Sequence, residues 1–134
     1  MTFFSKLGRN QNGTAATEFA LAIPIVMLLF YGMAQFGIIL LANAGIRHAL
    51  DRGARAATVY IGATPMTDQQ IKDVVTGNLY GVKNATMSPP NVSRGSSGGV
   101  NFVDITIAYS APVDLIVYQY GPITLSETRR AYLP

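Results

Sequence analysis

The chain has 134 residues, of which 49% are hydrophobic, and this leaves room for one small domain beside any long apolar segment. It contains no cysteine, which excludes a disulfide framework and thiolate metal sites. The net charge of +3 comes from basic residues scattered along the chain, whereas a nucleic-acid-binding protein gathers its basic residues on one face, so we expect no nucleic-acid partner.

Residues 1–13 predict a short cytoplasmic leader. They contain Lys6 and Arg9 and no acidic residue, and they end in the turn-prone string Asn10-Gln-Asn-Gly13. Without this leader the chain is close to neutral, with eight basic side chains against seven acidic ones.

The apolar run Ala20–Ala42 predicts a helix that spans a membrane. Its roughly 23 residues, interrupted by Pro24 and Gln35, reach about 34 Å at about 1.5 Å per residue, and a hydrocarbon core is about 30 Å thick. Pro24 leaves the carbonyl of Ala20 without its usual donor, so we expect a kink there. This proline is either simply tolerated, as in many membrane helices, or serves assembly.

Glu18 lies where this helix begins to bury itself, and a carboxylate there costs free energy unless it is compensated. One interpretation keeps Glu18 in the headgroup layer, where it complements the positive N-terminus of the helix. The other requires a cut after Gly13, which makes Thr14 a free amine one helical turn before Glu18. The amine and the carboxylate then neutralise each other, within one chain or between neighbouring helices.

The spacing of Gly13, Glu18 and Phe19 resembles a prepilin-peptidase processing site. The longer string Gly13-Thr-Ala-Ala-Thr-Glu-Phe-Ala-Leu-Ala-Ile-Pro24 resembles the opening of the TadE-like minor pilins, or pseudopilins, of the tight-adherence (Flp, type IVb-like) pilus system. Gln35-Phe36-Gly37 is similar to the family's usual Glu-Phe-Gly, with Gln in place of Glu. The resemblance covers the first sixty or so residues.

This resemblance implies a minor pilin-like subunit in the bacterial inner membrane, with its head in the periplasm. It implies cleavage by a prepilin peptidase after Gly13, and pairing of Glu18 with the free amine of a neighbour. The implied partners are other minor pilin-like subunits, the major Flp pilin, the prepilin peptidase, the inner-membrane pilus assembly platform and membrane lipid.

Two alternatives stay open at this point. Ala42-Asn43-Ala44 has the pattern of a secretory cleavage site, which predicts a mature start at Gly45, although the apolar run is longer than the usual 7–15 residues of a signal peptide. The second alternative is an unprocessed single-pass envelope protein whose head binds a partner. Basic residues lie on both sides of the apolar run, so charge does not decide the orientation.

The helix is predicted to run from about Thr17 to Val59, within a helical segment over residues 14–60. The part of the helix beyond the membrane, residues 43–60, contains regularly spaced small residues. Because small residues allow another backbone to approach, we expect close packing there. We expect this part to pack against the head and the apolar lower part to pack against sister subunits. The charged series Arg47, Asp51, Arg55 predicts ion pairs along the helix. The small residues recur at every fourth position: Gly45, Ala49, Gly53 and Ala57.

Residues 61–134 predict a small head. Thr67 and Gln70 have the spacing of a capping box, and apolar residues follow at helical spacing. Asp68–Leu79 is therefore predicted to be a short amphipathic helix, followed by a possible strand near Val82–Met87.

The rest of the head predicts strands. Arg94–Gly99 is predicted to be a flexible turn, and the alternation of apolar and polar residues over Phe102–Tyr109 indicates a half-buried strand. Pro112 is expected to break that strand, and Leu115–Tyr118 to form an apolar excursion before a last strand, Ile123–Tyr132. The predicted class is α+β, with an antiparallel sheet of about three strands laid on the upper half of the long helix.

No residue pattern predicts catalysis. His48 is the only histidine, and no serine or carboxylate lies at a telling spacing from it. The chain has no paired-histidine metal motif, nucleophile elbow or phosphate loop. We therefore expect no enzyme activity, no metal and no cofactor.

Overall fold

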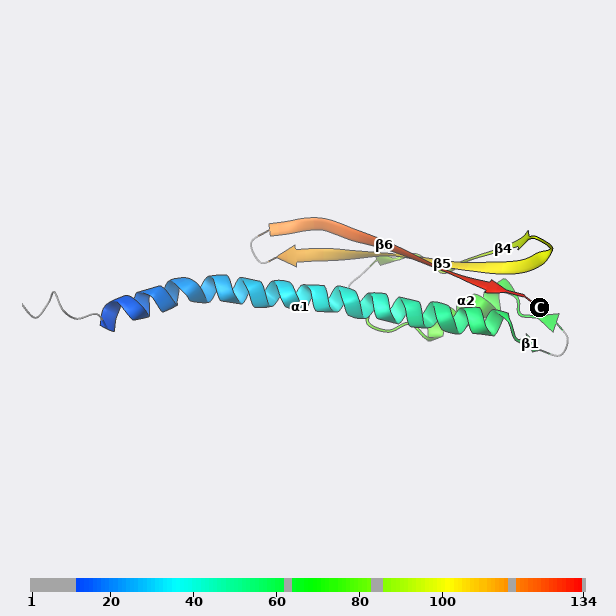
Figure 1. The fold of residues 1–134 in the computed structure, drawn as a ribbon, viewed down its shortest axis with the longest axis horizontal. Helices are drawn as coiled ribbons and strands as arrows, with labels where there is room; N and C mark the ends of the chain where they lie inside the picture. Colours follow the sequence, from blue (N-terminus) through cyan, green and yellow to red (C-terminus); the bar gives the residue numbers. More distant parts are fainter. Residues whose placement is uncertain (1–11, 62–63, 83–85, 116–117, 134) are drawn as a thin grey trace, which may run out of the picture.

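The computed structural model describes residues 12–61, 64–82, 86–115 and 118–133, and most of the predicted leader lies outside these residues. A long helix, a short second helix and an antiparallel sheet confirm the predicted α+β class (Figure 1). The elements in chain order are α1 (Asn12–Ala57), β1 (Tyr60–Ile61), β2 (Thr64–Pro65), α2 (Asp68–Gly77), β3 (Thr86–Met87), β4 (Asn91–Ser97), β5 (Val100–Leu115) and β6 (Tyr118–Tyr132).

Helix α1 has 46 residues and a length of about 69 Å. It begins five residues before the predicted start and ends two residues before the predicted end. Its N-terminal third projects as a bare rod beyond the head (Figure 1). Apolar side chains are exposed on every face of this third, as at Leu21 (74%) and Ile25 (69%). Among the described residues, α1 is the one helix long and apolar enough to cross a membrane, which fits a membrane anchor or a signal sequence.

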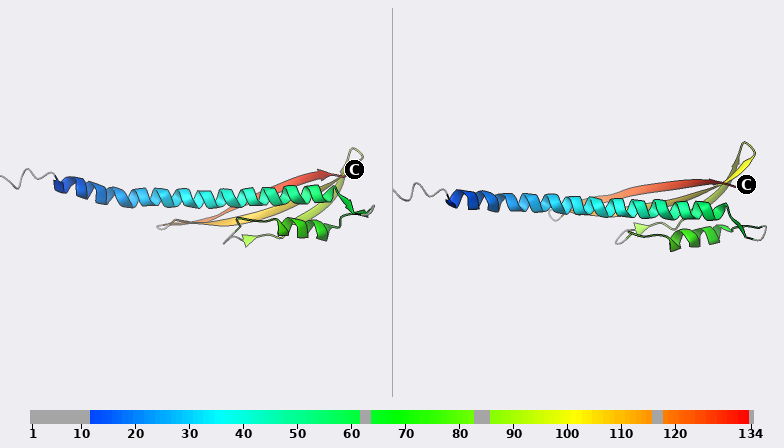
Figure 2. Two further views of the ribbon diagram at one scale, coloured as in Figure 1. Left: turned by 90° about the horizontal axis from the view of Figure 1, so that it is seen from below. Right: turned by 60° about the horizontal axis from the view of Figure 1, so that its bottom comes forward.

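The C-terminal half of α1 carries the head. Ala42, Ile46 and Ala49 begin a buried stripe at helical spacing, and this stripe packs on Ile71 and Val75 of α2 and on the apolar residues of β5. Helices α1 and α2 lie side by side against one face of the sheet (Figure 2). The head is thus a two-layer structure whose spine is the upper part of α1.

Strand β5 is the centre of the sheet. It pairs with β6 along nearly its whole length on one side, and with β4 and the two-residue β3 on the other, always antiparallel. The predicted alternation is confirmed, because Val103, Ile105, Ile107 and Tyr109 are all buried.

The prediction of a flexible turn over Arg94–Gly99 was wrong. Arg94 to Ser97 continue β4 and pair with β5, and only Gly98 and Gly99 make the turn. Both glycines have positive φ, 60° and 82°, which suits a two-residue hairpin turn. Polar residues on an exposed edge strand mimic a loop in sequence, which explains the error.

The prediction that Pro112 breaks the strand was also wrong. Strand β5 continues to Leu115, and its register with β6 shifts between Ala111 and Val113. Such a bulge tolerates a proline because the bulged residue donates no ladder hydrogen bond. Strand β6 correspondingly begins at Tyr118, before the predicted start. Residues 116–117 of the predicted excursion lie outside the described residues.

Helix α2 begins as predicted. The Thr67 side chain accepts from the backbone N–H of Gln70, and the Gln70 side chain accepts from the backbone N–H of Thr67, which is a complete capping box. The helix ends at Gly77, two residues before the predicted Leu79. The possible strand at Val82–Met87 is reduced to the short β3, and residues 83–85 lie outside the described residues.

Two ion pairs join β6 to α1. Arg47 lies 2.9 Å from Glu127, and Asp51 lies 2.6 Å from Arg129, so both residues pair across to the sheet instead of along the helix as predicted. Four residues of helix and two residues of strand both rise about 6 Å. If β6 slipped by two residues along α1, either Arg129 would face Arg47 or Glu127 would face Asp51, and like charges would meet. The two pairs therefore favour a single register of β6 on α1.

Candidate functional site

The residues of the predicted processing site all lie in the first two turns of α1. Gly13, Thr14, Glu18 and Phe19 are exposed. The hydroxyl of Thr17 donates to the carbonyl oxygens of Gly13 and Thr14, at 3.0 Å and 2.8 Å. The peptide bond between Gly13 and Thr14 therefore lies at a helix end, where backbone N–H groups lack intrahelical acceptors and the chain opens most easily.

Glu18 lies one helical turn after Thr14. Within the part of the chain that the structure describes, no basic side chain forms an ion pair with its carboxylate. The positive end of the helix favours a carboxylate only weakly beyond the first turn. In a hydrocarbon environment, Glu18 would thus need a cation other than the described basic side chains.

An apolar hollow of about 270 Å³ follows Glu18 directly. Its lining residues have the spacing i, i+3, i+4, i+7, i+8, so they form one face of α1. Faces of this kind form grooves into which the side-chain ridge of another helix can pack. Pro24 lies within this stretch, and the N-terminal third of α1 is visibly curved (Figure 1). Sequence analysis missed this face, because apolar residues surround the helix here and hide the pattern. The lining residues are Phe19, Ala22, Ile23, Val26 and Met27.

The small-residue ladder lies about 40 Å further along α1 and packs inside the head. Ala49 and Ala57 are buried. A methyl group added at Gly45 would overlap the carbonyl oxygen of Tyr80, and one at Gly53 would overlap Val75. The ladder and Glu18 are therefore separate features: the ladder faces its own head, and Glu18 lies on the bare rod.

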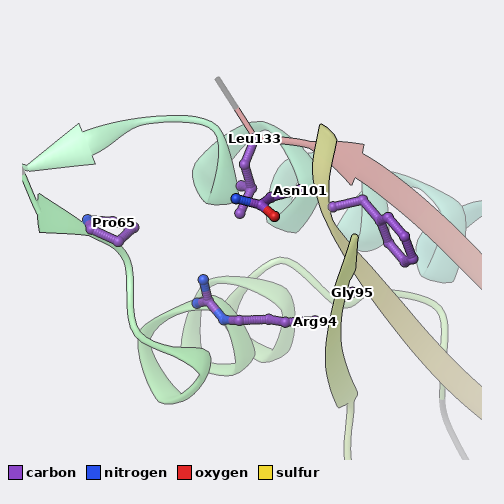
Figure 3. Close-up of a pocket in the computed structure, with 6 residues that line it drawn as sticks. Pro65, Arg94, Gly95, Asn101 and Leu133 are labelled. Atoms are coloured by element: carbon purple, nitrogen blue, oxygen red, sulfur yellow. The ribbon is translucent and has the colours of Figure 1, made fainter. Parts of the chain in front are cut away.

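A second pocket, of about 440 Å³, lies at the far end of the head (Figure 3). Among the described lining residues, Arg94 is the charged one. Its guanidinium donates to Asp68 at 2.7 Å and to the carbonyl oxygen of Met66 at 2.6 Å. These contacts tie β4 to the start of α2, so Arg94 is used structurally. Among the described residues, no group of three potential metal ligands is found, and His48 packs on the ring of Tyr80.

The open face of the sheet carries a charged cluster around Arg130. Arg130 donates two hydrogen bonds of 2.7 Å to the carboxylate of Asp104, and its guanidinium lies 3.9 Å from the ring centre of Phe102. The hydrogen bond from Arg130 holds the pKa of Asp104 below its usual 3.8, and partial burial opposes this effect. Only the β5–β6 register brings these residues together, so sequence analysis did not find the cluster.

This cluster predicts a stability change in acid. The pKa of Asp104 is lower in the folded chain than in the unfolded chain. Its contribution to the free energy of unfolding is therefore complete above the unfolded pKa and is lost as the pH falls through the folded pKa. In detergent, the melting temperature of Asp104→Asn is expected to lie below that of the wild type at about pH 6, and the difference is expected to shrink as the pH falls below the usual 3.8 of this carboxyl group. A difference that is independent of pH would contradict this assignment.

Comparison with protein families places a domain described as TadE-like protein over residues 13–55. The match begins at Gly13 and ends within the last turn of α1, so it covers the rod and the spine and not the rest of the head. Comparison with curated proteins and with solved structures gives no match.

Proposed function

Because residues 13–55 form a TadE-like domain, we propose that this chain is a minor pilin-like subunit for the assembly of a tight-adherence (Flp) pilus. It is held in the bacterial inner membrane by α1, with its head in the periplasm, and a prepilin peptidase cuts it after Gly13. The TadE-like family is pilin-like and not enzymatic, which agrees with the absence of catalytic patterns in the sequence.

One observation carries the proposal: the family domain begins at the glycine that precedes the predicted cut, and it opens a helix that is exposed from Gly13 to Phe30 among the described residues. An apolar rod of this kind needs lipid or other helices around it. In the proposed assembly the rod leaves lipid and enters a bundle of similar helices. Its apolar surface stays out of water throughout, so packing and charge decide whether the transfer occurs.

The apolar hollow and Glu18 have complementary roles in this mechanism. A neighbouring helix packs along the face that begins at Phe19 and ends at Met27. Its free amine, created by the cut before Thr14, then neutralises the carboxylate of Glu18 at a fixed depth. The pair sets the vertical register of one subunit against the next.

The partners of the proposed subunit are those that the family resemblance implies. Other minor pilin-like subunits and the major Flp pilin supply the neighbouring helices, and the prepilin peptidase supplies the cut. Membrane lipid holds the subunit before incorporation, and the inner-membrane assembly platform extracts it.

The proposal predicts that Gly13→Leu blocks processing. A Cβ added at position 13 meets no heavy atom of the described residues within 4 Å, so we expect the substitution to leave the fold intact and to act on peptidase recognition. The processed fraction is expected to fall roughly tenfold or more, because a pocket shaped for glycine excludes a larger side chain. An immunoblot against a C-terminal tag measures both forms.

The matched control is Gly37→Leu, since position 37 lies on the same helix and is equally open. It is expected to be cut like the wild type. Normal cleavage of Gly13→Leu would contradict the assignment of the processing site.

A further inference from the structure

Among the described residues, the head covers α1 from one side. Ala42, Ile46 and Ala49 are buried against the head. Leu40 and Ala44 lie beside these positions in the sequence and stay exposed. The opposite side of α1 is therefore open at the same level as the head.

The exposed residues form a strip along α1. Met33 and Leu40 are seven residues apart, as are Gly37 and Ala44, and Arg55 follows Ala44 by eleven residues. Seven residues make about two helical turns and eleven make about three, so these positions share one face. All five are exposed. We call them, together with Arg52 one turn before Arg55, the open strip.

The open strip has a flank on each side. On one flank, Arg47 pairs with Glu127 of β6 at 2.9 Å. On the other flank, the ring centres of His48 and Tyr80 are 5.6 Å apart. An element that docks between these flanks must run along α1. The seven-residue spacing of the apolar positions suits another helix, packed nearly parallel to α1.

The open strip changes from apolar to basic along its length. Met33 and Leu40, at its lower end, are 60% and 69% exposed. Arg52 and Arg55, at its upper end, are exposed, and no carboxylate of the described residues forms an ion pair with either guanidinium. The upper end of the strip thus carries two uncompensated positive charges.

These charges select between partners. A second copy of the chain, packed parallel along the strip, would bring its own Arg52 and Arg55 to the same level, and like charges repel. We infer that the open strip docks the helix of a different pilin-like subunit, which is apolar as far as the level of Ala44 and acidic at the level of Arg52 and Arg55. This inference rests on the proposed function, because parallel neighbours require that both subunits are anchored in the same membrane.

Disulfide cross-linking tests this partner chemistry, because the natural chain has no cysteine. The probe is the chain itself with Arg52→Glu and Arg55→Glu, which supplies a helix that is apolar and then acidic at the required level. Ala44→Cys is introduced into both the wild-type chain and the probe, and the two full chains carry different tags. They are co-reconstituted in phosphatidylcholine vesicles, oxidised, and analysed on non-reducing gels.

At low salt, the pair of wild type and probe is expected to cross-link roughly fivefold more than the pair of two wild-type chains, because two repulsive contacts become attractive. This excess should shrink at about 1 M salt, where exposed charges are screened within about 3 Å. A second probe, with Arg52→Gln and Arg55→Gln, introduces no carboxylate and should give an intermediate yield. Thr76→Cys, exposed on α2 and outside the strip, is the matched control that sets the background.

Two results would overturn the inference. Equal cross-linking of the mixed pair and the wild-type pair through Ala44→Cys would show that the strip accepts a second copy. A yield of the mixed pair no higher than that of Thr76→Cys would show that no parallel helix docks on the strip. Cleavage after Gly13, at the other end of α1, is measured separately, so either result leaves the proposed processing intact.

Discussion

Gly45→Ala is expected to destabilise the head by about 3 kcal/mol, the upper part of the range for overpacked cores. The added methyl group would overlap the carbonyl oxygen of Tyr80 and lie 2.9 Å from its carbonyl carbon. This backbone cannot withdraw easily, because the next residue, Gly81, has a φ of 73° and itself packs closely on Leu41. Two backbones therefore meet at a point where only glycine fits.

The comparison with other glycines makes this prediction specific. At Gly53 a methyl group would meet the side chain of Val75, which can shift slightly, so Gly53→Ala is expected to cost about 1 kcal/mol. At Gly77 nothing lies within 4 Å, so Gly77→Ala should be neutral or stabilising by about 0.5 kcal/mol. Urea unfolding of the full chain in detergent, followed by circular dichroism, measures all three. Equal stability of Gly45→Ala and Gly77→Ala would show that the close approach at Gly45 is not real.

Glu18→Ala is expected to leave membrane insertion unchanged and to reduce capture of the partner subunits roughly tenfold or more. The lost contact is a charge-assisted hydrogen bond in a poorly hydrated environment, which is worth about 1.5–3 kcal/mol. Glu18→Gln should behave similarly, because it keeps the shape and loses the charge. Co-purification of the partners from native membranes, normalised to the amount of inserted subunit, gives the measurement.

A double-mutant cycle isolates the pairing role of Glu18. If a free amine at Thr14 is the partner within the same chain or on a neighbouring copy, Gly13→Leu removes it, and Glu18→Ala should then have little further effect. Independent, additive losses would mean that Glu18 acts through some other group. Asp73→Asn is a control for a general loss of acidity, because Asp73 lies exposed on α2.

The parts of the fold that were predicted correctly follow from local patterns. The helix over most of residues 12–57, the capping box at Thr67 and the alternation along β5 each depend on neighbours within a few residues. The errors at Arg94 and Pro112 have a common cause. In both places, pairing with a distant strand overrides the local preference of a glycine- and serine-rich segment or of a proline.

The candidate site likewise combines a feature that can be recognised in the sequence with features that only the structure reveals. The string from Gly13 to Phe19 is contiguous, so the resemblance to a processing site was visible in the sequence. The one-sided hollow near Pro24 was concealed by apolar residues on all faces, and only the bare rod of the structure exposes it. The pairing of Arg47 with Glu127 joins residues eighty positions apart, and no local rule selects that partner.

The central claim is that proteolysis creates the amine that Glu18 requires. The most direct test is the N-terminal sequence of the protein extracted from its native envelope, with the peptidase present and the chain expressed at its natural level. The account predicts that the mature chain begins at Thr14. A functional, partner-bound protein that still begins at Met1 would contradict it.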